Sequence, residues 1–454
     1  MSRGTDTIVA IATAAGRGGV GIIRVSGSAA TSTVASLAGA MPPARQASLR
    51  SFRRADGTVL DEGLLLYFPA PHSFTGEDVV ELQAHGSPVA LGEILEALCE
   101  AGARIARPGE FSERAFLNGR MDLAQAEAVA DLIEASSRAG ARAASRSVQG
   151  EFSRKIDTAV EALISLRVLL EAALDFSDEE VPAAAPAVLL TKLQALADDI
   201  AAVLHASQQG RRLREGMRVA IAGQPNVGKS TLLNRLAGVD AAIVSPHAGT
   251  TRDVLRESVL VDGLPLIIID TAGLRETADP IEREGIRRAR SEIAQAELVL
   301  LLVDDRDTDL AAQLRLVQAE LSDRETTLPI LIVRNKCDLS GGEPGTTNTY
   351  REHTSIRVSA TSGDGLDTLK TAIRTRAGLD DSSTQMFSAR ARHVESLQEA
   401  ALHIRLARHH AGTQDAVLVA EELRLAQRAL ETITGRFGSE ELLGRIFSSF
   451  CLGK

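Results

Sequence analysis

The segment GQPNVGKS, from Gly223 to Ser230, has the residue types and the spacing of a phosphate-binding loop. It follows the apolar run MRVAIAG and precedes the helical pattern TLLNRLAG, which is the strand–loop–helix context that such a loop requires. Its glycines let backbone amides surround phosphates, and the helix N-terminus adds partial positive charge. Lys229 is expected to reach the β- and γ-phosphates, and the hydroxyl of Ser230 is expected to bind Mg²⁺. The segment therefore predicts a nucleoside triphosphate site.

Two later motifs predict that the base is guanine. Asn335, Lys336 and Asp338 form NKCD after another apolar run. The carboxylate of Asp338 can accept hydrogen bonds from both N1–H and the 2-amino group of guanine, a pair that adenine does not offer. The segment VSA, which ends in Ser359 and Ala360, is expected to supply the second contact to the base.

The residues that catalyse GTP hydrolysis are harder to identify from the sequence than those that bind the nucleotide. Asp270 ends the run LPLIIID and begins DTAG, where it is expected to hold the magnesium shell while the Gly273 amide senses the γ-phosphate. Ras-like GTPases place a water-orienting glutamine directly after DTAG, but this chain has Leu274, which cannot polarise water. The amide oxygen of Asn226 and backbone carbonyls of 245–253 could instead hold a monovalent cation, which would replace the charge of an arginine finger.

Thr251 is then the expected switch-loop ligand of magnesium, and Glu282 is a candidate to position the attacking water. A solvated charge at a helix start is the alternative interpretation of Glu282. The residues expected to contact the nucleotide are Asn226, Val227, Gly228, Lys229, Ser230, Thr231, Ser245, Pro246, His247, Ala248, Gly249, Thr250, Thr251, Asp270, Thr271, Ala272, Gly273, Asn335, Lys336, Asp338, Ser359 and Ala360. The expected metal ligands are Asn226, Ser245, His247 and Thr250 for the monovalent cation, and Ser230 and Thr251 for Mg²⁺.

The elements that must position these residues can be read from hydrophobic periodicity. Between residues 216 and about 377, the aliphatic runs MRVAIAG, LPLIIID, LVLLLVD and LPILIVRNK alternate with helical stretches, which predicts a parallel sheet buried on both faces. The segments 119–215 and 378–454 carry apolar residues at helical spacing. We therefore expect the parallel α/β domain to be inserted into a helical domain. Residues 1 to about 118 predict a mixed α/β domain with strands in TIVAIATAAG, VGIIRVSG, EGLLLYF and VVELQAHGS, and a helix over 88–102.

Composition limits the class of protein. Of 454 residues, 44% are hydrophobic, and the longest strongly apolar run, LVLLLV, is far shorter than the ~20 residues that span a bilayer. We therefore expect no membrane insertion. A formal charge of −10 excludes a basic coat for nucleic acid, although basic residues gathered on one face can still bind RNA. Three cysteines exclude a disulfide scaffold and favour a reducing, cytoplasmic location.

The whole chain resembles the MnmE (TrmE) family of tRNA-modification GTPases. The resemblance rests on GRGGVGIIRVSG, SFTGEDVVELQAHG, RPGEFSERAFLNGRMDLAQAEAVADLI, GQPNVGKSTLLN, AGTTRDV, DTAGLR and the terminal GRIFSSFCLGK. It implies a multidomain α/β protein with a dimerising, tetrahydrofolate-binding-like α+β domain over 1–118, a helical domain over 119–215 and 378–454, and an inserted P-loop GTPase domain with a Ras-like parallel sheet over 216–377.

The resemblance also implies an activity. GTP hydrolysis would be stimulated by K⁺ and would drive a conformational cycle in a homodimer. With a flavoprotein partner, MnmG (also called GidA), which carries FAD, the dimer would add an aminomethyl-type group, carboxymethylaminomethyl, to carbon 5 of the wobble uridine of certain tRNAs. The one-carbon unit would come from a tetrahydrofolate derivative, in its 5-formyl or 5,10-methylene form.

Several residues take roles from the same resemblance. The positions that match the family's folate pocket are Arg24, Glu81, Arg120 and Lys454, and those that match its catalytic and switch residues are Glu282, Cys451 and Arg275. A carboxylate such as that of Glu81 suits the amino-pyrimidine edge of a pterin, and arginines suit a glutamate tail. The alternative for Arg24 and Glu81 is a surface charge on a strand, and a cysteine without the terminal motif would be structural.

Two other functions remain open from the sequence. One is a ribosome-assembly GTPase that acts as an RNA-binding switch, but the segment from Asp381 onward has nine basic and nine acidic residues and so is no basic RNA-binding module. The other is a folate-dependent methyltransferase that GTP merely regulates.

Overall fold

The computed structural model describes residues 6–175, 186–237, 257–270, 296–307, 309–320, 328–379, 386–413, 415–436, 446–448, 450 and 453. Two compact units make up the chain. The first comprises Met1–Ala130, Ile156–Val160 and Gln427–Lys454, and the second comprises Asp131–Lys155 and Glu161–Ala426. The domain boundaries expected near residues 118, 215 and 377 stay predictions.

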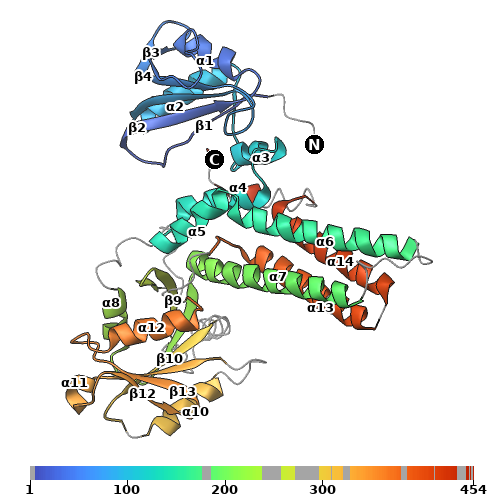
Figure 1. Cartoon of the computed structure of the whole chain (residues 1–454). Helices are drawn as coiled ribbons and strands as arrows, with labels where there is room; N and C mark the ends of the chain where they lie inside the picture. The colour runs from blue at the N-terminus through green and yellow to red at the C-terminus, as the bar shows by residue number, and fades with distance from the viewer. Residues whose placement is uncertain are drawn as a thin grey trace, which may run out of the picture. The chain divides into compact units, whose positions relative to one another are not determined.

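The first unit is built on a six-stranded sheet, whose strands and helices are visible in Figure 1. The strand order is β3-β4-β5-β2-β1-β6, antiparallel throughout except for the parallel pair of β1 and β6. Its elements are β1 (Ile8–Ile11), β2 (Gly18–Ser26), α1 (Ala30–Ala38), β3 (Ser48–Arg53), β4 (Val59–Phe68), β5 (Val79–Gly86), α2 (Pro88–Glu100), β6 (Arg104–Ile105) and α3 (Glu110–Leu117). Residues of α1 and α2, among them Val34, Ile94 and Leu98, form one core with the sheet residues Ile23 and Leu82.

The four strands and the helix predicted for this region are confirmed as β1, β2, β4, β5 and α2. The sequence did not predict β3, β6, α1 or α3. β3 reads SLRSFR and buries only Phe52, so it carries no strong apolar period. In α1, ATSTVASLA, the buried Ala30, Val34 and Leu37 do have helical spacing, but the segment is short and rich in serine and β-branched residues. Both acquire their structure from packing against the sheet, since local propensity alone is weak there.

A buried ion-pair network lies at the start of α3. The carboxylate of Glu110 is almost fully buried and accepts hydrogen bonds from Arg104 Nη2 at 2.7 Å and from the Arg107 amide at 2.7 Å. Arg114, also buried, contacts the carboxylates of Glu77 and Asp6 at 3.1 Å and 2.8 Å. Burial alone would raise the pKa of Glu110, but its hydrogen bonds to Arg104 and the Arg107 amide lower that pKa to about 2.

This network predicts an acid-sensitive domain. Because the folded-state pKa of Glu110 lies below its usual value, the stabilisation is fully present at neutral pH and is lost as pH falls from about 4.5 to 2. We expect Glu110→Gln to lower the free energy of local opening by about 3 kcal/mol at pH 7 and to flatten its pH dependence below pH 5. Hydrogen exchange of the β1 and β2 amides in the full-length chain measures both quantities. An unchanged slope below pH 5 would contradict the assignment.

The C-terminal end of the chain returns to the first unit. Ile446, Phe447 and Phe450 are buried and share a core cluster with Leu123 and Ala126 of α4 (Leu123–Glu134). Gly453 lies against the end of β1 with φ +90°, and a Cβ at this position would meet the Ile11 carbonyl oxygen at 2.3 Å. A glycine is therefore required beside β1, because both the backbone angle and the close approach exclude a side chain.

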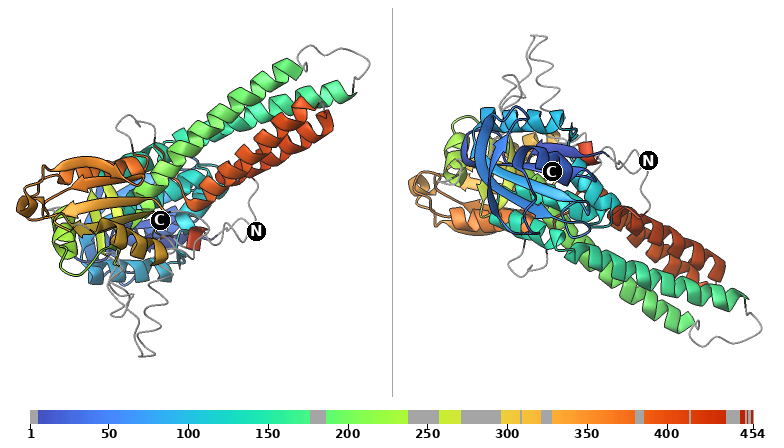
Figure 2. Two further views of the ribbon diagram at one scale, coloured as in Figure 1. Left: turned by 90° about the horizontal axis from the view of Figure 1, so that it is seen from below. Right: turned by 90° about the horizontal axis from the view of Figure 1, so that it is seen from above.

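The second unit contains long helices that run side by side (Figure 1 and Figure 2). They are α6 (Glu151–Asp175), α7 (Pro186–Glu215), α13 (Ala391–Gly412) and α14 (Ala416–Thr434), although Ile156–Val160 of α6 and the end of α14 from Gln427 are counted in the first unit. The second unit also contains the shorter α5 (Arg138–Val148). α7 packs along α13, and their buried residues include Leu193, Ile200, Leu397 and Ile404. Of the helices predicted here, those over α6, α7 and α14 are confirmed. No helix among the described residues has the length and apolarity that crossing a membrane would take.

The same unit contains a seven-stranded sheet in the order β12-β13-β11-β10-β7-β9-β8. Its elements are β7 (Met217–Ala222), α8 (Lys229–Ala237), β8 (Glu257–Val261), β9 (Leu264–Asp270), β10 (Leu298–Asp304), α10 (Leu310–Glu320), β11 (Ile330–Asn335), α11 (Cys337–Ser340), β12 (Gly345–Tyr350), β13 (His353–Arg357) and α12 (Leu366–Arg376). The five central strands are parallel and the edge strands β8 and β12 are antiparallel. The predicted parallel runs are confirmed as β7, β9, β10 and β11, and each β10 residue from Leu298 to Val303 is buried.

Candidate functional site

The loop between β7 and α8 has the backbone geometry of a phosphate cradle. Gly223 has φ +147°, and a Cβ there would lie 2.3 Å from the Leu302 carbonyl oxygen of the neighbouring strand. Gly228 has φ +98°, and its Cβ would meet the side-chain amide of Asn335 at 2.4 Å. Both positions therefore require glycine. Lys229 begins α8, and its ammonium folds back over the loop to the Gly223 carbonyl at 3.1 Å. A loop of this shape fits a phosphate chain against its amides and ammonium.

Asn335 joins the three motifs expected to form the nucleotide site. Its buried side-chain amide donates to the Val227 carbonyl in the cradle at 2.8 Å. Its Oδ1 accepts from the Ala360 amide at 2.9 Å. Ser359 is fully buried, and its hydroxyl oxygen accepts from the Ser362 amide at 3.1 Å, which holds this loop closed. The phosphate loop, NKCD and VSA are therefore neighbours in the fold, and their contacts with a nucleotide stay a prediction.

Lys336 and Asp338 line the open side of this junction. Lys336 has φ +67°, and its ammonium donates to the Asn226 carbonyl at 2.8 Å and contacts Asp304 at 3.0 Å. Hydrogen bonding by Arg306 and Lys336 holds the pKa of Asp304 below its usual range. Asp338 is exposed, so its carboxylate is accessible to a base. The thiol of Cys337 is buried beside it, and burial raises its pKa, which makes it a packing residue.

Asp305 is a positioning residue that the sequence analysis did not identify. Its carboxylate is almost fully buried and pairs with Arg334 Nε at 2.5 Å and with Arg357 Nε at 3.1 Å. The hydroxyl of Ser340 in α11 donates to its other oxygen at 2.5 Å. Burial would raise the pKa of Asp305, but these partners hold it below its usual range. One carboxylate thus ties β11 and β13 to the short helix that carries Asp338. The sequence signal that could have identified Asp305 is the pair Asp304 and Asp305 at the end of a buried apolar run.

We expect Asp305→Asn to weaken GDP binding by about tenfold, because neutralising the carboxylate leaves two guanidiniums unpaired and frees α11. Binding of inosine diphosphate should fall less, since that base lacks the 2-amino group that Asp338 is expected to read. Titration of each nucleotide into the variant measures the ratio of the two affinities. The matched control is Asp367→Asn, a fully exposed aspartate on α12. An equal loss for both nucleotides would indicate general destabilisation and contradict the positioning role.

Part of the predicted site lies outside the described residues. Asp270 is the last residue of β9, where its backbone pairs with Ile221 close to the phosphate loop. The predicted residues outside the description are Ser245, Pro246, His247, Ala248, Gly249, Thr250, Thr251, Thr271, Ala272, Gly273, Arg275, Glu282, Cys451 and Lys454. Their predicted roles stay predictions.

A second candidate site lies on the sheet of the first unit. Arg24 on β2 and Glu81 on β5 face each other in register and form a half-buried ion pair at 2.8 Å. The guanidinium of Arg24 also stacks over the rings of Phe74 and Phe111, at 5.0 and 5.9 Å from their centroids. Phe111 is fully buried and Phe74 is partly exposed, so a flat, polar heterocycle could contact the two charges and the ring of Phe74. Arg120 is exposed beside the loop at Gly76, where its Cγ would lie 3.1 Å from an added Cβ.

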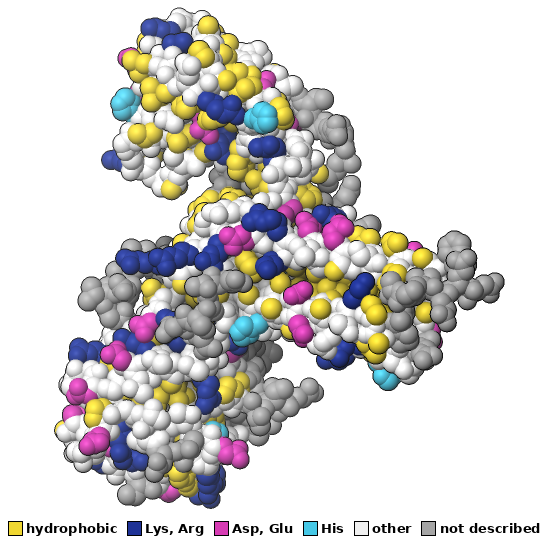
Figure 3. Space-filling view, viewed as in Figure 1, with side chains coloured by type: hydrophobic (Ala, Val, Ile, Leu, Met, Phe, Trp, Pro, Cys, Tyr) yellow, Lys and Arg dark blue, Asp and Glu magenta, His cyan; other side chains and the backbone are white. Residues whose placement is uncertain are grey.

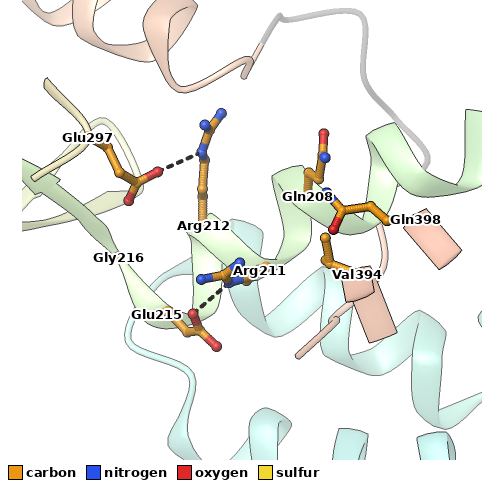
Figure 4. A pocket seen from close by; sticks show the side chains of 8 residues that line it. All are labelled: Gln208, Arg211, Arg212, Glu215, Gly216, Glu297, Val394 and Gln398. Carbon is orange, nitrogen blue, oxygen red and sulfur yellow. Dashed lines mark hydrogen bonds and ion pairs between the residues drawn. The ribbon is translucent and has the colours of Figure 1, made fainter. Parts of the chain in front are cut away.

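A polar pocket of about 210 Å³ lies at the C-terminal end of α7, where the side chains from α7, α13 and the start of β10 converge (Figure 4). Its two arginines are already paired, Arg211 with Glu215 at 2.8 Å and Arg212 with Glu297 at 3.3 Å. Arg212 also donates to the Ala377 carbonyl at 2.6 Å. Arg212 thus connects α7 to the residue before β10 and to the residue after α12, so these side chains serve a structural role in the pocket.

Comparisons with known proteins agree with this arrangement. A family model described as the GTP-binding protein TrmE N-terminus matches residues 7–120, and one described as the MnmE helical domain matches residues 123–451. Proteins named tRNA modification GTPase MnmE from Yersinia pestis (strain Angola) and Methylococcus capsulatus are 52% and 51% identical to this chain, each over 99% of both sequences. The solved structure of Aquifex aeolicus Era bound to GDP and AlF₄⁻ matches 42% of this chain and 67% of its own at 25% identity, with a TM-score of 0.27, too low to support an inference.

Proposed function

Because this chain belongs to the MnmE family of tRNA modification GTPases, we propose that it couples GTP hydrolysis to a defined tRNA modification. The chain is a GTP hydrolase that acts in tRNA modification. In the finer proposal, it acts with the flavoprotein MnmG, which carries FAD. Together they add a carboxymethylaminomethyl group to carbon 5 of the wobble uridine of certain tRNAs, with a one-carbon unit from a tetrahydrofolate derivative.

The observation that supports the GTP-binding part of the proposal is the junction at Asn335. One buried amide side chain hydrogen-bonds both the phosphate loop and the segment expected to contact the base, at 2.8 Å to Val227 and 2.9 Å to Ala360. A single rigid residue therefore sets the distance between phosphate and base recognition. Mg²⁺ fits the hydroxyl of Ser230 at the start of α8, and it would neutralise charge on the phosphates.

K⁺ is proposed to supply the positive charge that an arginine finger supplies elsewhere. Asn226 is exposed in the phosphate loop, so its side-chain oxygen is free to act as one ligand, with Ser245, His247 and Thr250 contributing the others. Leu274 follows DTAG and cannot orient the attacking water. We therefore propose that the carboxylate of Glu282 positions this water. Arg275 would act as a switch residue, whose position changes between the GTP-bound and GDP-bound states.

We expect GTP hydrolysis to be at least about tenfold faster in KCl than in NaCl at equal ionic strength, because K⁺ would compensate transition-state charge. Steady-state phosphate release in the two salts is the measurement. Asn226→Gly is the informative variant: it removes the ligand oxygen, and glycine accepts the φ of +64° at this position without strain. The variant should lose the difference between the salts. Equal wild-type rates in both salts would contradict the cation mechanism.

The folate proposal rests on the first unit. Arg24, Glu81, Arg120 and Lys454 would hold the tetrahydrofolate derivative, 5-formyl or 5,10-methylene, and Cys451 would be the reactive thiol near it. The charges of Arg24 and Glu81 fit the polar edge of a pterin, and the partly exposed ring of Phe74 beside Arg24 fits its flat face. When bound, folate supplies the one-carbon unit, and the chain's residues orient it and hold protons at its polar edge.

We also propose a homodimer formed through this unit, in the cytoplasm. Leu49 on β3 and Leu64 on β4 are directly opposite each other and are 61% and 38% exposed, on the sheet face that also carries Gln83. Adjacent exposed leucines on a sheet face favour an interface between proteins.

The experiment that tests the proposal is mass spectrometry of tRNA nucleosides from cells that lack this chain and from complemented cells. We expect the aminomethyl-type wobble uridines to vanish and to return only with the intact gene. An unchanged nucleoside profile would leave the GTP site standing and would overturn the modification role.

A further inference from the structure

The helix α5 presents three arginines on one face. Arg138, Arg142 and Arg146 follow one another at four-residue spacing, which places them about 6 Å apart along the axis. The opposite face of the helix is buried through Ala143 and Ala144. The helix contains no aspartate or glutamate, and Figure 3 shows basic side chains in a row over it.

None of these three guanidiniums has a hydrogen bond or ion pair to the part of the chain that the structure describes. The basic residues of the neighbouring helix α7 differ: Arg214 pairs with Asp131 at 2.7 Å, and Arg211 is paired as described above. Like charges four residues apart on a helix lower its stability by about 0.2–0.5 kcal/mol per pair. Among the described residues no carboxylate pairs with these guanidiniums, which points to an external anionic partner.

We propose that this arginine face, defined as Arg138, Arg142 and Arg146, binds the phosphate backbone of the tRNA. The inference rests on the proposed function, which makes tRNA the substrate. A chain with a formal charge of −10 repels RNA overall, so binding requires a local basic face. Guanidinium groups suit phosphates because their planar donors can bind two oxygens at once.

The face fits RNA better than a protein partner. The partly exposed residues beside the arginines on this side of α5 are Ala141 and Ser145, which are small. A protein interface is usually anchored by aromatic or large apolar side chains, and this face has none. A row of evenly spaced cations without apolar anchors instead contacts successive phosphates and reads no sequence.

The test is replacement of all three arginines by glutamine, which retains the helix propensity and removes the charge. Binding of unmodified tRNA to the full-length protein is measured over a range of KCl concentrations. We expect affinity to fall at least about tenfold at 0.1 M salt, and the slope of log K against log salt to decrease by about 2 to 3. GTP hydrolysis without tRNA should be unchanged. Replacement of the same three residues by lysine should preserve most of the slope.

The matched control replaces Arg315, Arg405 and Arg428 by glutamine, which gives the same change of net charge on exposed positions of other helices. An equal loss of affinity in this control would mean that net charge alone is responsible and would overturn the proposal. Normal tRNA binding by the α5 variant, in a protein whose wild type binds, would also overturn it. Absence of tRNA binding by the wild type would instead contradict the proposed function.

Discussion

Asp338→Asn is expected to lower the affinity for GDP by about a thousandfold and to admit xanthosine diphosphate. The carboxylate would accept two hydrogen bonds from guanine, each worth about 2 kcal/mol when one partner is charged. Xanthine has an oxygen in place of the 2-amino group, so it repels a carboxylate but can accept from the amide of asparagine. Asp338 is exposed and makes no contact on which the loop depends, so the change should leave the loop intact.

The structure explains why this substitution should change base selectivity without displacing the base-recognition loop. The position of the base-recognition loop is set by Asn335, Lys336 and Asp305, none of which is changed. Titration of GDP and xanthosine diphosphate into the variant and into Asp367→Asn measures the selectivity directly. A GDP-to-xanthosine-diphosphate ratio equal to that of the wild type would refute the role of Asp338 in reading guanine.

Removal of the last four residues, 451–454, is expected to abolish tRNA modification by at least about a hundredfold while GTP hydrolysis stays within about twofold. The proposed thiol of Cys451 and the proposed folate contact of Lys454 are lost together. Phe447 and Phe450 remain in their core cluster with Leu123, so the truncated chain keeps its anchor. Nucleoside mass spectrometry and phosphate release, measured on the same protein, separate the two activities.

A point substitution makes the same test without shortening the chain. Gly453→Ala would bring a Cβ within 2.3 Å of the Ile11 carbonyl oxygen and should displace the tail from β1. The matched control is Gly39→Ala, also at positive φ but with open space around it. Modification should fall in the first variant and persist in the second. Full modification by the truncated chain would remove Cys451 and Lys454 from the proposed mechanism.

The sequence by itself determined the nucleotide loop and the core of the sheet that carries it. GQPNVGKS is continuous and lies between a strand and a helix, so its residue types and spacing identify the loop from neighbours in the chain alone. The close approach of Leu302 and Asn335 to Gly223 and Gly228 became visible only in the fold. The buried strands β7, β9, β10 and β11 are also local signals, since a strand covered on both faces is apolar at nearly every position.

Only the tertiary structure decided which distant residues meet. Asp305 is one of several acidic residues after β10, and its contacts with Arg357, 52 positions away, depend on the order of the strands. Arg24 and Glu81 are paired by sheet register, 57 positions apart. α5 lacked an apolar period because its buried face is made of alanine, so its free arginines became visible only once the helix and its partners were in place. Partners set by long-range packing carry no local signal in the chain, whereas a phosphate loop carries its whole geometry in eight consecutive residues.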